Sequence, residues 1–234
     1  MSRVCLLALL SGLAFLASTA LGQASLSTPK LDAPGGTQLA ESVQKARAQG
    51  ETKITTPAAA YTQRVPPTLD EAVAESRVVI ARADASTTTV DTIGVGLVTW
   101  DKLHVIEVLH DLDSNSDTHL KPSQKLPKEM GSLSQGDIVL SYSGGTAIVD
   151  GVMVTTPSAH VALQKGKTYL LFLNPHPSED AYFLMFGSDA IYQVVGSRVI
   201  PSRSAKSNLI GTELKEKFGN DLISLKSHFS STQR

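Results

Sequence analysis

The run from Gly166 to Asn174 constrains the fold more than any other stretch beyond the first two dozen residues. Its apolar centre, Tyr169 to Leu173, lies between Gly166 and the pair Asn174-Pro175. An apolar run of this length is too short for a membrane span. Gly166 and Pro175 bound it so closely that an ordinary helix does not fit between them. The run therefore predicts a central β-strand. Two inward-facing sets are open, namely Tyr169, Leu171 and Leu173, or Leu170 and Phe172.

Short strands separated by turn signals surround this run. Asp150-Gly151 lies between two apolar runs, 147–149 and 152–154, and predicts a β-hairpin with a type I′ turn. The extended segment Val95–Leu109 changes phase, because Leu103 and Val105 share one face and Ile106 and Val108 the other. A change of phase indicates either a β-bulge or a strand buried on both sides. The strands together predict a mainly β domain, either an antiparallel barrel or a sandwich.

Helices are predicted only at the two ends of this β region. Thr68 and Glu71 have the spacing of a capping box, which predicts a short helix to about Ser76. Near the C-terminus, apolar residues at three- and four-residue spacing predict two short helices divided at Gly219-Asn220. These residues are Leu214, Phe218, Leu222, Leu225 and Phe229.

The N-terminus has the composition of a cleaved secretory signal. Arg3 supplies a positive charge, an apolar region follows from Cys5 to Leu16, and small residues crowd the segment up to Ala24. This order predicts a signal peptide over residues 1–24 and a secreted or periplasmic protein with no stable membrane span after cleavage. The only cysteine, Cys5, is removed with the signal, so disulfides and thiol chemistry are excluded from the mature chain.

Residues 25–67 have the composition of a disordered tether. Pro, Ser, Thr, Ala, Gln and Gly dominate, and aromatic residues are nearly absent. A short helix over 38–49 is marginal in isolation. Ser42-x-x-Lys45 has the spacing of a serine-acylase motif but lacks that motif's partners. The predicted organisation is therefore a signal (1–24), a tether (25–67), a β domain that is a barrel or a sandwich (68–205) and a C-terminal helical cap (206–234).

Charge and motif content limit the function. The formal charge is −1, and loss of Arg3 makes it −2, so there is no electrostatic attraction to nucleic acid. No nucleophile elbow, paired-carboxylate motif or dinucleotide fingerprint occurs in the sequence. We therefore expect no cofactor and no catalytic residue.

The order of the strands resembles that of a known family. The segments are 78–82, the strand ending at Leu109, the strand 138–140 that runs into Gly144-Gly145, and 166–173. This succession resembles the netrin-like OB-barrel of the tissue inhibitors of metalloproteases, and exported bacterial proteins with the same layout, over residues 69–200. The resemblance implies an OB-like antiparallel barrel. Those inhibitors act through an N-terminal cysteine, which the mature chain lacks.

Few side chains are candidates for a binding site. His104, His110, Asp111 and Asp113 are weak candidates for a metal site, because no established His spacing accompanies them. Trp100 is a candidate contact for a partner, although packing in the core or rim is the favoured interpretation. We expect an exported, non-enzymatic binding module whose partner is a protein or glycan of the cell envelope. The alternatives are a metal-dependent hydrolase and a protease-inhibitor-like protein.

Overall fold

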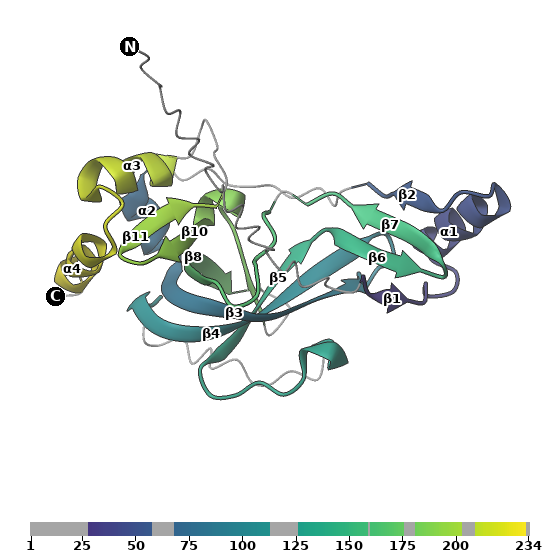
Figure 1. Ribbon diagram of the computed structural model, residues 1–234, viewed down its shortest axis with the longest axis horizontal. Coiled ribbons are helices and arrows are strands. Elements are labelled where there is room, and N and C mark those ends of the chain that lie inside the picture. The colour runs from purple at the N-terminus through teal and green to yellow at the C-terminus, as the bar shows by residue number, and fades with distance from the viewer. Residues whose placement is uncertain are drawn as a thin grey trace, which may run out of the picture.

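The computed structural model describes residues 28–57, 68–112, 126–158, 160–175, 181–202 and 209–232. Over these ranges the chain is mainly β, with two sheets and a few helices (Figure 1). The predicted signal peptide and residues 58–67 of the predicted tether lie outside the described residues. No helix in the described ranges has the length and apolar character needed to cross a membrane.

The larger sheet has seven strands in the order β11-β10-β8-β3-β4-β5-β9. β9 pairs in parallel with β5 and also pairs with β8. Within the group β3, β4, β5, β9 and β8, each strand therefore pairs with two others of the group. All other neighbours in this sheet are antiparallel. The strands are β3 (Arg77–Val90), β4 (Leu97–His110), β5 (Asp137–Ser143), β8 (Thr168–Pro175), β9 (Tyr182–Phe183), β10 (Ile191–Val195) and β11 (Arg198–Pro201).

β8 is the strand predicted from the apolar run, and that prediction is confirmed. It lies between β3 and β10, and residues 169–173 are all buried. Both alternating sets are therefore inside, so neither set alone is the inward one. The ring of Phe172 meets that of Tyr192 edge-on at 6.1 Å between centroids.

Three helices lie at one end of the larger sheet (Figure 1). They are α2 (Leu69–Ala74), α3 (Leu209–Phe218) and α4 (Leu222–Thr232), and their apolar residues belong to the same core as β8. Thr68 caps α2 by accepting a hydrogen bond from the Glu71 N–H at 3.1 Å, as the capping box predicts. Gly219 and Asn220, both with φ of 60°, separate α3 from α4 at the predicted break.

The bulge expected in the long strand is confirmed in β4. Val78 pairs with His110 and Val79 with Val108, and Ile80 pairs with Glu107 and Ala81 with Val105, so Leu109 and Ile106 are extra residues. Ile106 is 56% and Val108 40% exposed. The alternative prediction, a strand buried on both faces, is therefore wrong at this position. Asp84 is the extra residue of a third irregularity, on β3.

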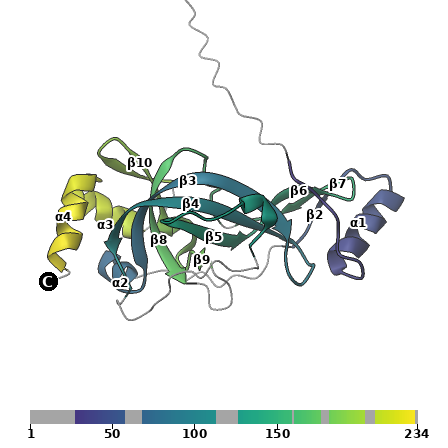
Figure 2. The same cartoon turned by 90° about the horizontal axis from the view of Figure 1, so that it is seen from below.

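The smaller sheet has the order β1-β6-β7-β2 and lies at the opposite end of the molecule from α3 and α4 (Figure 2). Its strands are β1 (Lys30–Leu31), β2 (Lys53–Thr55), β6 (Gly145–Val149) and β7 (Val152–Thr156). The hairpin β6–β7 turns at Asp150 and Gly151, whose φ values of 46° and 87° suit a type I′ turn. That prediction is confirmed.

The prediction of a disordered tether is wrong for residues 28–57. They form β1, β2 and the helix α1 (Gln38–Ala48), which buries Leu39, Val43 and Ala46 against Val149, Val152 and Val154. An isolated helix of this length is marginal, but burial of its apolar face in a second core stabilises it. The composition of the segment alone gives no sign of that core.

Candidate functional site

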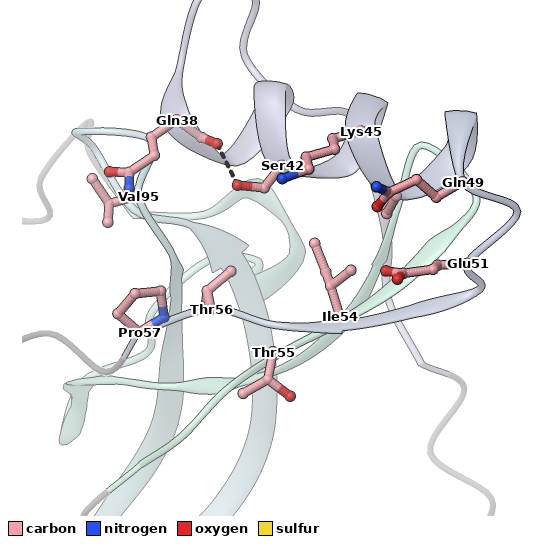
Figure 3. A pocket seen from close by; sticks show the side chains of 11 residues that line it. Gln38, Ser42, Lys45, Gln49, Glu51, Ile54, Thr55, Thr56, Pro57 and Val95 are labelled. Carbon is pink, nitrogen blue, oxygen red and sulfur yellow. Dashed lines mark hydrogen bonds between the residues drawn. The ribbon is translucent and has the colours of Figure 1, made fainter.

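A groove of about 250 Å³, whose lining residues are mostly polar, lies between α1 and β2. We call it the α1–β2 groove. Ser42 and Lys45 project into it from α1, and Gln49 does so from the residue after the helix. Ile54 and Thr56 point toward the helix from below (Figure 3). The other lining residues are Gln38, Ala46, Glu51, Thr55, Pro57 and Val95.

The orientation of α1 follows from its caps and its apolar face. Thr37 accepts a hydrogen bond from the Ala40 N–H at 3.2 Å, and the Leu39 N–H donates to the Gly94 carbonyl at 2.9 Å. Gly94 has φ of +68°, and a Cβ there would lie 2.4 Å from the side chain of Thr37. Because the helix buries its apolar face, its opposite side faces β2. That side carries polar residues at spacings of four, three and four, namely Gln38, Ser42, Lys45 and the C-cap residue Gln49.

β2 is an edge strand, so some of its backbone N–H and C=O groups are free to bind a ligand beside the groove. Among the described residues it pairs only with β7, through bonds such as Thr56 N–H to Thr155 C=O at 3.0 Å and Met153 N–H to Thr52 C=O at 2.9 Å. In a parallel pair, alternate residues direct both backbone groups to the same neighbour. Lys53 and Thr55 therefore direct their N–H and C=O groups to the free edge.

Two threonines fix the position of the strand beneath the groove. The hydroxyls of Thr56 and Thr156 lie 2.5 Å apart and both side chains are buried. Thr156 Oγ1 also accepts from the Leu97 N–H at 3.0 Å. This buried bonding holds the end of β2 against β7 and β4, so the groove has a rigid floor.

The Ser42-x-x-Lys45 spacing lies within this groove. The Ser42 hydroxyl donates to the Gln38 carbonyl at 2.9 Å, a bond within the helix. Nothing in the described part of the chain completes an acylase motif around these two residues. Ser42 and Lys45 are therefore polar residues of the groove wall.

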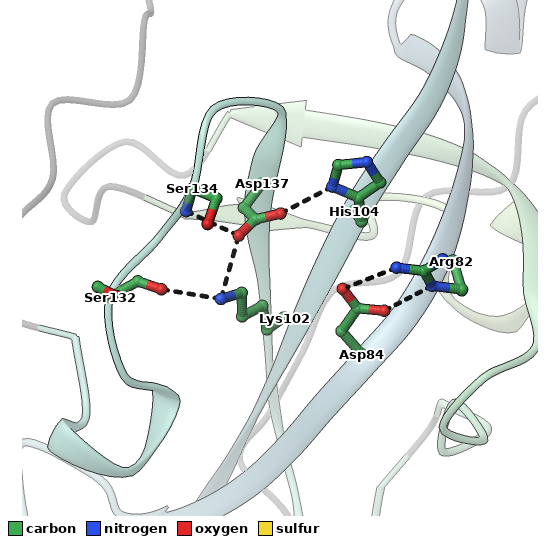
Figure 4. Close-up of polar contacts among 7 residues, drawn as sticks. All are labelled: Arg82, Asp84, Lys102, His104, Ser132, Ser134 and Asp137. Atoms are coloured by element: carbon green, nitrogen blue, oxygen red, sulfur yellow. Dashed lines mark hydrogen bonds and ion pairs between the residues drawn. The ribbon is translucent and has the colours of Figure 1, made fainter.

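A second cluster of polar side chains surrounds Asp137, at the start of β5 (Figure 4). Its carboxylate accepts from His104 Nδ1 at 3.0 Å, from Lys102 Nζ at 3.0 Å and from the Ser134 N–H at 2.8 Å. Burial raises the pKa of Asp137, but the bonds from His104, Ser134 and Lys102 outweigh that effect and the pKa is lowered. Asp137 is therefore an ionised, fully engaged acceptor.

Asp84, His104 and Asp137 are the three described residues whose ligand atoms come close enough to hold a metal, all within 4.8 Å of one another. Each carboxylate already faces a cation. Arg82 Nε donates to Asp84 at 2.7 Å, and Lys102 donates to Asp137. Two positive and two negative side chains balance without an ion, so the arrangement fits an ion-pair network better than a metal site.

The structure does not bring the predicted metal candidates together. His104 lies opposite Arg82 and His110 opposite Val78, four residues along β3, which corresponds to roughly 13 Å. Asp111 forms an ion pair with Arg77 at 3.3 Å. Asp113 lies outside the described residues. Only His104 belongs to a cluster, and its partners are Asp137 and Asp84.

Trp100 does not present a face for a partner. It is 7% exposed, packs with Met130, Val139 and Ala181, and its indole N–H donates to Thr89 at 2.9 Å. The favoured interpretation of the sequence, packing in the core or rim, describes its position.

Sequence reasoning missed the groove because all of its lining residues except Val95 fall in the segment taken as a tether. One signal was present, since Leu39, Val43 and Ala46 share one face of a short helix and imply a polar opposite side. Asp84 and Asp137 were also missed. Their approach to His104 depends on the bulge at Asp84 and on the β4–β5 register.

Comparisons of the chain with protein-family models, with curated proteins and with solved structures give no match.

Proposed function

We propose that this protein is an exported, non-enzymatic binding module that holds an extended polypeptide segment of a cell-envelope partner in the α1–β2 groove. The observation that carries the proposal is the position of an edge strand beside the polar side of a helix. An extended segment added beside β2 would receive backbone hydrogen bonds from Lys53 and Thr55. Gln38, Ser42 and Gln49 would supply side-chain donors and acceptors along the other wall.

The lining favours a polypeptide over a glycan. The N–H and C=O groups of Lys53 and Thr55 on the free edge of β2 match the hydrogen-bonding groups of an extended polypeptide backbone. Lys45 and Glu51 place one charge of each sign in the groove, which suits a segment of low net charge. The mature charge of −2 gives no support to nucleic-acid binding.

The export part of the proposal rests on residues 1–24, whose order of charge, apolar region and small residues is that of a secretory signal. The finer description of the fold is likewise a proposal. We infer an OB-like barrel from the five strands β3, β4, β5, β9 and β8, which pair in a ring with one parallel pair. The resemblance to netrin-like proteins supports the same description.

Photo-crosslinking in the cell envelope tests the proposal. A photoreactive side chain at position 42 faces the groove, and one at Glu41 lies on the same helix outside it. We expect the probe at position 42 to label a defined segment of one partner, identified by mass spectrometry, and the probe at position 41 to leave it unlabelled.

Substitution of Thr55 tests the strand-addition mode directly. Thr55→Pro removes the N–H that points to the free edge, and proline is tolerated on an edge strand in that orientation. It should abolish the crosslink, and Thr55→Val, which keeps the N–H, should preserve it. Equal labelling by both variants would refute strand addition. Hydrolytic turnover by the purified chain that is lost in His104→Ala would favour the metal-dependent hydrolase instead.

A further inference from the structure

A buried carboxylate without an ionic partner lies inside the larger sheet, away from the α1–β2 groove. Asp101, on β4, is 1% exposed. Neither of its oxygens makes a hydrogen bond of ordinary geometry with a described residue, and the same holds for the hydroxyl of the nearby Tyr142. Buried charges are nearly always paired in folded proteins, so a buried carboxylate whose polar neighbours are neutral hydroxyls indicates a cationic ligand.

Four elements converge on this carboxylate. Ser86 on β3 pairs directly with Asp101, and Tyr142 on β5 pairs with Thr99, the next inward-facing residue of β4. Burial raises the pKa of Asp101 to about 6, and the nearby hydroxyls of Ser86 and Tyr142, which act as hydrogen-bond donors, offset only part of that rise. Burial raises the pKa of Tyr169 on β8, and the negative charge of Asp101 adds to that rise.

The loop from 157 to 166, described except for residue 159, lies against this cluster. The His160 ring meets the Tyr142 ring edge-on at 5.4 Å between centroids, and the Gln164 N–H donates to the Tyr169 hydroxyl at 2.9 Å. Burial lowers the pKa of His160 to about 4, so this imidazole is neutral at neutral pH. None of the groups that act on the Asp101 pKa is cationic.

We propose that Asp101 and Tyr142 bind a compact monovalent cation, an ammonium or alkali-metal ion, between β4, β5 and the 157–166 loop. One carboxylate neutralises a single positive charge, whereas a divalent ion would retain a net charge beside a side chain that is 1% exposed. The Asp101 oxygens and the hydroxyls of Tyr142 and Ser86 are all oxygen acceptors, as such ions require.

Thermal unfolding of the full chain in different salts tests this site. At pH 7.5 and equal ionic strength, sodium, potassium and ammonium chlorides are compared with N-methylglucamine chloride, whose cation is too bulky to enter. We expect at least one small cation to raise Tm saturably, by about 3–6 °C at ten times its Kd. Because protonation of Asp101 competes with the ion, its apparent affinity should fall about 30-fold at pH 4.5.

Three variants make the result specific. Asp101→Asn should abolish the response, Tyr142→Phe should weaken it, and Asp32→Asn, which removes an exposed carboxylate elsewhere, should leave it unchanged. Rubidium soaked into crystals should give an anomalous peak at Asp101. Equal Tm values in all four salts, or a response that survives in Asp101→Asn, would overturn the proposal and leave Asp101 as a protonated or hydrated buried acid.

Discussion

His104 Nδ1 lies 3.0 Å from Asp137 Oδ1, and Lys102 occupies the other oxygen of the same carboxylate. The Asp137 side chain is only 4% exposed, so its three donors replace water almost completely. The histidine that was a candidate metal ligand thus belongs to an ion-pair network between β4 and β5.

Asp137→Asn should lower the free energy of unfolding at pH 7 by about 1–3 kcal/mol, because the amide keeps the shape but loses the charge that faces Lys102. The folded pKa of Asp137 is lowered, so its stabilisation is present above the ordinary pKa and is lost as pH falls through the folded value. Urea unfolding at pH 7 and pH 3 should show the difference shrinking in acid. Asp111→Asn, whose carboxylate is 58% exposed, is the control and should change stability by under ~1 kcal/mol.

Asp101→Asn should have the opposite effect. The folded pKa of Asp101 is about 6, raised from 3.8. Ionisation of Asp101 therefore lowers the free energy of unfolding as pH rises from about 4 to 6. In N-methylglucamine buffer at pH 7.5, the variant should be more stable than the parent chain by up to about 3 kcal/mol. The gain should vanish below pH 4. A destabilised variant at pH 7.5 would show that the charged carboxylate has a favourable partner in the folded protein.

Phe172→Ala should lower the free energy of unfolding by about 3–5 kcal/mol, because Phe172 is fully buried on β8 and contacts Tyr192. Lys167→Ala, an exposed position just before the same strand, should stay within ~0.5 kcal/mol. Chemical denaturation of the two variants gives the comparison. A loss under ~1 kcal/mol at Phe172 would mean that β8 is peripheral to the core.

Gly145→Ala should be strongly destabilising. Gly145 has φ of +138°, and a Cβ there would lie 2.7 Å from Thr99 Oγ1 and 2.9 Å from Thr88 Cγ2. Gly151→Ala has only the backbone cost, because its φ is +87° and nothing lies within 4 Å, so about 1 kcal/mol is expected. Thermal unfolding should place Gly145→Ala well below Gly151→Ala in Tm. Equal Tm values would show that Thr88 on β3 and Thr99 on β4 move aside easily from the start of β6.

Features set by neighbouring residues could be predicted from the sequence. The Thr68 cap, the Asp150-Gly151 turn, the break at Gly219-Asn220 and the bulged β4 all depend on local patterns, and the structure contains each of them. β8 was predictable because its apolar run is bounded at both ends.

Features set by distant contacts could not be predicted. α1 is stable because Leu39 and Val43 meet a hairpin more than a hundred residues further along the chain, and composition carries no trace of that encounter. Asp137 meets His104 only through the β4–β5 register, and Asp101 becomes isolated only when β3, β5 and the 157–166 loop close around it. The contacts that complete the candidate sites therefore depend on residues far apart in the sequence.

The length of β3 and β4 makes the two halves of the molecule inseparable. Both strands contribute to both cores, with Ala83 and Leu103 in the larger one and Val90 and Leu97 in the smaller one. A fragment trimmed at residue 68, as the tether interpretation would suggest, retains Leu97, Val149 and Val154 but loses the helix that covers them. Those apolar surfaces would then be open to solvent in every copy, so the trimmed protein should aggregate during expression rather than yield a smaller soluble domain.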